Sequence, residues 1–114
     1  MEMKDLPGHY KELRDEFPDF FQALEGLGQK ARSAGPLDAK TVELLQLAAA
    51  AAVRSEGAVH SHARRALAAG ATREELCHTL LAVTSTIGFP TVAAALSWVR
   101  DVTGVREVTA NTKK

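Results

Sequence analysis

A glutamate and a histidine on two successive predicted helices are the first candidates for chemistry. Glu43 stands in a stretch, residues 42–53, in which Gln46 is the only other polar residue. A carboxylate there is either partly buried and in need of a partner, or an exposed first-turn glutamate favoured by the helix dipole. His62 shares a helix face with apolar residues, namely Ala58, Val59, Ala66 and Ala69. Such a histidine is either a core residue with satisfied hydrogen bonds or an acid/base group lining a pocket.

Two histidines of the fourth predicted helix raise the question of a metal. His60 and His62 are two positions apart, which separates them by about 200° around a helix, so they cannot chelate one ion together. His60 instead shares a face with Glu56 and Arg64, which predicts a solvated polar stripe. We therefore expect no metal site.

Ser55 and Cys77 are the remaining candidate nucleophiles. Ser55 precedes a predicted helix and is expected to be its N-cap, because nothing near it supplies the base and oxyanion hole of a nucleophilic serine. Cys77 is the only cysteine, which excludes an intrachain disulfide and a CxxC site. It lies beside an apolar helix stripe, where a buried thiol is inert. A single thiol favours a reducing compartment, and we expect a cytoplasmic protein.

Helices separated by glycine, proline and capping residues are predicted along the whole chain, without the alternation typical of strands. Asp38 is expected to cap the third helix, and Thr72 with Glu75 forms a capping box that opens the fifth. The corner Gly88-Phe89-Pro90 precedes the last helix and could also shape a pocket wall. The six predicted helices cover residues 7–17, 18–34, 39–54, 56–69, 72–87 and 91–102. The prediction is a single all-α domain over residues 1–114, with N-terminal helices at 7–34 and a frayed tail at 106–114.

Charge and hydropathy exclude several classes of partner. The 14 basic residues balance the 14 acidic ones, which argues against nucleic acid, since phosphate binding relies on a basic surplus. The longest nearly apolar run, residues 44–53, is about half the length that a bilayer span needs, and no signal peptide is recognised. We therefore expect no membrane association. The helix over 42–53 is apolar nearly all round, which predicts burial in a domain core or an oligomer.

Three motifs carry a resemblance to a known family. They are LDxKTxEL at residues 37–44, HxxxALxAGAT at residues 62–72 with the two glutamates that follow, and the GFP corner at residues 88–90. Over residues 37–96 the chain resembles the carboxymuconolactone decarboxylase / alkylhydroperoxidase D-like family. The resemblance implies an alkylhydroperoxidase D-like helical domain in a closed homo-oligomer, a trimer or a hexamer. The second and sixth predicted helices are expected to supply the interface.

The redox branch of this family carries a glutamate, a CxxC twelve residues later and a histidine four residues beyond the second cysteine. Glu43 and His62 keep this spacing, but Ser55 and Ala58 stand where the two cysteines would be. A serine hydroxyl does not cycle between redox states, so peroxidase or disulfide-reductase activity by the family route is disfavoured.

The decarboxylase branch also lacks the CxxC. The resemblance therefore implies an enzyme without metal or organic cofactor, acting on a small carboxylated lactone or a related acid. His62 is the expected acid/base and Glu43 its orienting partner, with the pocket between the third and fourth helices. The candidate substrate-binding residues are Arg54, Arg64, Arg65 and Phe89. Two alternatives stay open: a non-catalytic oligomeric binding protein with a relic pocket, and a thiol-dependent antioxidant that uses Cys77.

Overall fold

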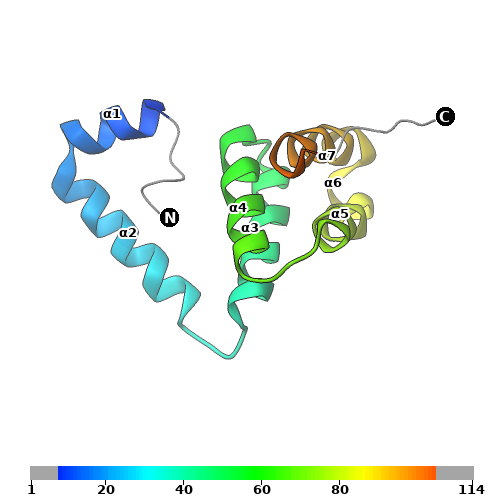
Figure 1. Cartoon of the computed structure of the whole chain (residues 1–114), viewed down its shortest axis with the longest axis horizontal. Coiled ribbons are helices and arrows are strands. Elements are labelled where there is room, and N and C mark those ends of the chain that lie inside the picture. Colours follow the sequence, from blue (N-terminus) through cyan, green and yellow to red (C-terminus); the bar gives the residue numbers. More distant parts are fainter. Residues whose placement is uncertain (1–7, 105–114) are drawn as a thin grey trace.

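The computed structural model describes residues 8–104, and every regular element among them is a helix (Figure 1). The seven helices are α1 (Gly8–Glu16), α2 (Pro18–Arg32), α3 (Ala39–Ala52), α4 (Glu56–Ala68), α5 (Arg73–Ala82), α6 (Thr84–Ile87) and α7 (Phe89–Thr103). The predicted all-α fold is confirmed, while the tail predicted to fray, residues 106–114, lies outside the described residues. No described helix combines the length and the apolar character that a membrane span requires.

The helix predicted over residues 72–87 is divided into α5 and α6 in the structure, which gives seven helices instead of six. Val83, between the two, has φ −101° and ψ 11°. Its amide donates to the Leu80 carbonyl oxygen at 3.3 Å, the tighter spacing that closes a helix. Four of the five residues from 83 to 87 are β-branched, and β-branched side chains lose rotamer freedom in a helix. The sequence does not predict this break, because the apolar residues keep the spacing of a continuous helix on both sides of Val83.

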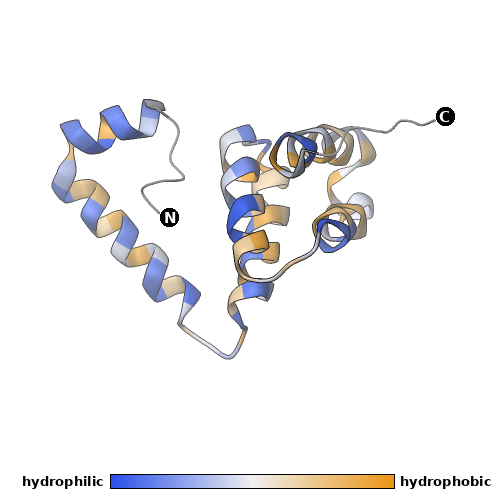
Figure 2. Ribbon diagram, viewed as in Figure 1, coloured by the Kyte–Doolittle hydropathy of each residue, from blue (hydrophilic) through white to orange (hydrophobic). Residues whose placement is uncertain are grey.

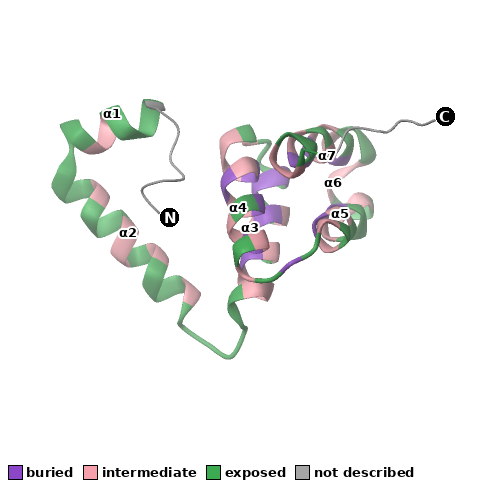
Figure 3. Ribbon diagram, viewed as in Figure 1, coloured by how far each residue is buried: buried purple, intermediate pink, exposed green. Residues whose placement is uncertain are grey.

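The helices α3 and α4 form the most extensively packed pair of the molecule, and α5 and α7 pack against them (Figure 1). Only residues 53–55 connect α3 to α4, as expected for antiparallel neighbours. The buried residues lie on the parts of these helices that face one another (Figure 3). The buried apolar residues of the four helices are Leu47, Ala50, Ala51, Val59, Ala63, Ala66, Leu76, Leu80, Val92, Ala95 and Val99. The many alanines among them allow the helix axes to approach closely.

The helices α1 and α2 form an arm that extends away from this core (Figure 1). None of the described side chains of the arm is buried, in contrast to those of the central helices (Figure 3). Apolar residues nevertheless recur along α2 (Figure 2), where Phe20, Leu24 and Leu27 are 63%, 47% and 64% exposed. An apolar helix face of this kind is typically covered by another surface. The arm thus offers an apolar face next to the core without packing into it.

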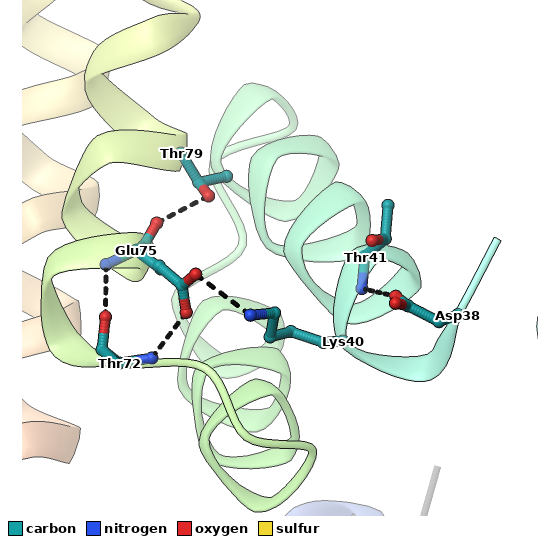
Figure 4. Close-up of polar contacts among 6 residues, drawn as sticks. All are labelled: Asp38, Lys40, Thr41, Thr72, Glu75 and Thr79. Atoms are coloured by element: carbon teal, nitrogen blue, oxygen red, sulfur yellow. Dashed lines mark hydrogen bonds and ion pairs between the residues drawn. The ribbon is translucent and has the colours of Figure 1, made fainter.

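Polar contacts join the beginnings of α3 and α5 (Figure 4). Asp38 caps α3, since its Oδ1 accepts a hydrogen bond from the Thr41 amide at 2.8 Å. Thr72 and Glu75 form the predicted capping box of α5, with hydrogen bonds of 3.1 and 2.9 Å. The other Glu75 oxygen accepts from Lys40 Nζ at 3.0 Å. One carboxylate therefore both caps α5 and ties it to α3.

Gly88 sets the angle at which the chain enters α7. Its φ of 89° and ψ of 147° belong to a region that is essentially restricted to glycine. The helix then begins at Phe89, two residues before the predicted start, because Pro90 suits a first turn in which its missing amide hydrogen is not needed.

The Gly88→Ala substitution is expected to lower the free energy of unfolding by about 1–3 kcal/mol, because a Cβ strains this backbone conformation. The matched control is Gly57→Ala in α4, where nothing lies within 4 Å of an added Cβ. The control should leave the stability unchanged or raise it by up to about 1 kcal/mol, since alanine favours a helix over glycine. Urea denaturation of both variants measures the difference, and equal effects of the two would contradict the prediction.

Candidate functional site

Glu43 on α3 and His62 on α4 meet across the central helix pair. His62 Nδ1 lies 2.9 Å from Glu43 Oε1. The side chain of Glu43 is 5% exposed and that of His62 is 15% exposed. Glu43 occupies the inner face of α3 one turn before Leu47, which is why it is buried rather than an exposed first-turn glutamate. Glu43 is therefore a buried carboxylate with a partner. His62 is largely buried, and its Nδ1 has a hydrogen-bond partner.

Arg65 completes this cluster from the next turn of α4. Its Nε lies 3.4 Å from Glu43 Oε2, and its side chain is 10% exposed. Arg65 Nη1 is buried and has no hydrogen-bond partner among the described residues. The sequence predicts Arg65 only as a candidate substrate-binding residue and does not predict its contact with Glu43. The spacing from His62 to Arg65 was the available signal, since residues three apart share a helix face.

The electrostatics of the cluster keep Glu43 ionised. Burial opposes ionisation, but the hydrogen bond from His62 and the charges of Arg65, His62 and Arg32 outweigh it, so the pKa of Glu43 lies below its ordinary value. An ionised carboxylate can only accept hydrogen bonds, so His62 Nδ1 carries the hydrogen of the shared contact. His62 Nε2 is then the ring nitrogen that remains for a ligand, and it has no hydrogen bond to another described residue.

A cavity of about 230 Å³ lies beside this cluster. It is bounded by the arm on one side and by α3 and α4 on the other, whereas the predicted pocket lay between α3 and α4 themselves. Alanines pack closely where α3 and α4 face one another, and the cavity lies on the side of this pair that faces the arm. The lining residues are Tyr10, Arg14, Phe21, Leu24, Glu25, Gly28, Arg32, Gln46, His62 and Arg65.

The remaining candidate substrate-binding residues do not line this cavity. Arg54 follows α3 with a φ of 58°, and its Nη1 donates to Thr91 Oγ1 at 2.6 Å. Arg64 and Phe89 are exposed elsewhere on the surface. Among the four candidates, only Arg65 therefore reaches the cavity.

The two residues that replace the family cysteines, Ser55 and Ala58, take part in the N-terminal cap of α4. Ser55 is the N-cap of α4, as predicted, and its Oγ accepts a hydrogen bond from the Ala58 amide at 3.3 Å. Neither residue lines the cavity. Cys77 lies on α5, partly buried instead of fully buried as its apolar stripe suggested. The chain thus carries no second thiol near any of these positions.

His60 joins α4 to α7 instead of pointing freely into solvent. Its Nε2 lies 3.0 Å from Asp101 Oδ2 and 3.9 Å from Glu56 Oε2, and its side chain is 23% exposed. The predicted polar stripe missed Asp101, because that residue is 41 positions away in the sequence. These three residues bring three potential ligand atoms within 4.8 Å of one another. The hydrogen bond of 3.0 Å between His60 and Asp101, together with the one-turn spacing of Glu56 and His60 on α4, already accounts for that proximity.

The fold and the site define the class of protein: a small helical domain with a histidine–carboxylate pair beside a cavity and without a redox thiol pair. Residues 18–101 match the model of the carboxymuconolactone decarboxylase family. The chain belongs to this family, which confirms the resemblance recognised in the sequence.

Two similar proteins extend this assignment. A carboxymuconolactone decarboxylase family protein from Legionella pneumophila, solved in its apo form, superposes with a TM-score of 0.75. The two are 29% identical, and the match covers 87% of this chain and 88% of that one. An uncharacterized protein from Haemophilus influenzae is 39% identical over 67 residues, which is 55% of this chain. The match spans 59% of the length of that relative.

Proposed function

We propose that the protein is an acid/base enzyme of decarboxylase type, acting on a small carboxylated lactone or a related acid without a thiol. The observation that carries the proposal is the 2.9 Å contact between His62 Nδ1 and Glu43 Oε1 at the wall of a cavity. This contact orients the imidazole, so that its Nε2 can serve as an acid/base group toward a molecule in the cavity. The family assignment supports the same class of reaction.

The proposed reaction breaks the bond between the carboxylate carbon and the ring carbon of the substrate. CO₂ leaves, and the bonding electron pair moves into the conjugated lactone carbonyl as an enolate. His62 Nε2 then donates a proton to the carbon that carried the carboxylate, and the imidazole recovers its proton from solvent. Glu43 stays ionised throughout and holds the ring by Nδ1.

Thiol chemistry is the less favoured candidate. The geometry of the redox branch requires a thiolate at the beginning of a helix with a second thiol one turn later. At those places the chain has a capping serine and an alanine. A peroxidase that uses Cys77 alone would need a partner thiol from another molecule, and Cys77 is not among the residues that line the cavity.

The test is a screen of carboxylated lactones and related small acids with the purified protein. CO₂ release and loss of the parent acid are measured together, and decarboxylation should release one CO₂ for each molecule of acid consumed. Turnover that persists after Cys77→Ser and is absent from heat-inactivated protein supports the proposal. If no acid is consumed across the panel, the alternative of a non-catalytic binding protein is favoured. Hydroperoxide consumption that stops with Cys77→Ser would instead favour the thiol-dependent antioxidant.

We also propose that the chain forms a closed homo-oligomer, a trimer or a hexamer, in the cytoplasm. The exposed apolar face of α2 supports self-association, and the single cysteine supports a reducing compartment. Analytical ultracentrifugation measures the state directly. A Leu27→Glu variant on the same face, outside the cavity lining, should dissociate the oligomer, whereas a monomeric wild type at micromolar concentration would contradict the proposal.

A further inference from the structure

An unsatisfied buried guanidinium nitrogen stands at the proposed site. Arg65 is about nine-tenths buried, and its Nε is engaged with Glu43, but Nη1 has no acceptor among the described residues. Buried polar groups in folded proteins nearly always have a hydrogen-bond partner, so an exception at a cavity wall calls for an explanation. A ligand that brings an acceptor oxygen would provide the missing partner.

The charges around the cavity indicate the sign of that ligand. Three arginines line it, Arg14, Arg32 and Arg65, against one lining carboxylate, Glu25. The nearby carboxylate of Glu43 already interacts with His62 and Arg65. Guanidinium groups therefore outnumber carboxylates among the lining residues themselves, while Arg14 also lies 3.6 Å from Asp15 Oδ1 just outside the lining. A guanidinium pairs with carboxylates better than a point charge does.

The rest of the lining indicates the body of the ligand. Tyr10, Phe21 and Leu24 come from the arm and offer aromatic and aliphatic surface opposite the polar cluster. The cavity volume of about 230 Å³ suits a molecule of the size of one substituted ring. A molecule that is apolar at one end and anionic at the other matches both walls.

We propose that Arg65 is the anion-binding residue of this cavity and that its Nη1 donates to the carboxylate of a small ligand with a flat apolar body. Through Nε the same side chain keeps its contact with Glu43, so one guanidinium links the ligand to the acid/base pair. The inference rests on the proposed function for the identity of the site. Binding of the anion, however, does not require turnover.

The test uses benzoate as the probe and benzamide as its neutral counterpart of the same shape. Isothermal titration calorimetry at constant ionic strength compares the wild type, Arg65→Gln and Arg64→Gln. Arg64 is the matched control, because it is adjacent in sequence but exposed and outside the cavity. We expect benzoate to bind the wild type and the control at least about tenfold more tightly than benzamide, as one charge-assisted contact would give. Arg65→Gln should remove most of that preference.

A second variant keeps the inference testable if Arg65→Gln does not fold. Arg65→Lys keeps the charge near Glu43 but loses the planar fork, so it should bind benzoate more weakly than the wild type while still preferring it to benzamide. Equal affinity of the wild type for benzoate and benzamide would overturn the inference, as would undiminished benzoate binding by both variants. Selective benzoate binding with no turnover of any acid would retain the anion site and remove the proposed function. Turnover of an acid without any preference for benzoate over benzamide would retain the proposed function and remove the anion site.

Discussion

Replacing Glu43 by alanine is expected to lower the free energy of unfolding by about 3–5 kcal/mol, the range for removing one partner of a buried charged pair. Glu43 is 5% exposed, accepts a hydrogen bond from His62 and forms an ion pair with Arg65. Without it, the Arg65 guanidinium would stay buried with Nε as well as Nη1 unpaired. Urea denaturation at pH 7, read by circular dichroism, measures the loss.

Two comparisons make this prediction specific. Glu74→Ala, on the exposed surface of α5, should cost less than about 1 kcal/mol, because only its interaction with the helix dipole is lost. The pH dependence provides the second comparison. The pKa of Glu43 is lowered by folding, so its contribution is present above about pH 4.3, the value for an unperturbed glutamate, and is lost as the pH falls through its lowered native pKa. The stability difference between wild type and Glu43→Ala should therefore shrink in acid. A difference independent of pH would contradict the assignment of a buried ionised carboxylate.

His62→Gln is expected to lower kcat by a factor of about 10²–10⁴ on any acid that the wild type decarboxylates. Glutamine can still donate a hydrogen bond to Glu43, but it cannot carry and release a proton near neutral pH. The loss should therefore appear in kcat more than in KM, since the proton transfer is needed only in the reaction step. Initial rates of CO₂ release at saturating and subsaturating substrate separate the two parameters.

The matched control for this variant is His78→Gln. His78 is an exposed histidine on α5 and does not line the cavity, so its replacement should leave kcat unchanged. Circular dichroism and thermal denaturation of His62→Gln show whether the fold survives the substitution. Unchanged turnover in a folded His62→Gln protein would refute the role of His62 as acid/base and leave the Glu43–His62 contact as a structural pair.

Local sequence determined the helices and their caps. Asp38, Ser55 and the capping box at Thr72 and Glu75 were all predicted and are all present, because each cap depends on hydrogen bonds within three residues. The break at Val83 was not predicted, since apolar residues can keep a helical spacing even where the backbone dihedral angles leave the helix. Local spacing therefore specified where helices begin more reliably than whether they continue.

The sequence also identified Glu43 and His62 as partners, but through the family spacing, since nothing local links residues 19 positions apart. Only the tertiary structure decided that Arg65 holds the same carboxylate, that His60 binds Asp101, and that the cavity lies on the arm side of α3 and α4. Each of these depends on how whole helices pack. Periodicity gives the face that a helix buries, whereas the angle and distance to its neighbour determine which side chains meet across it.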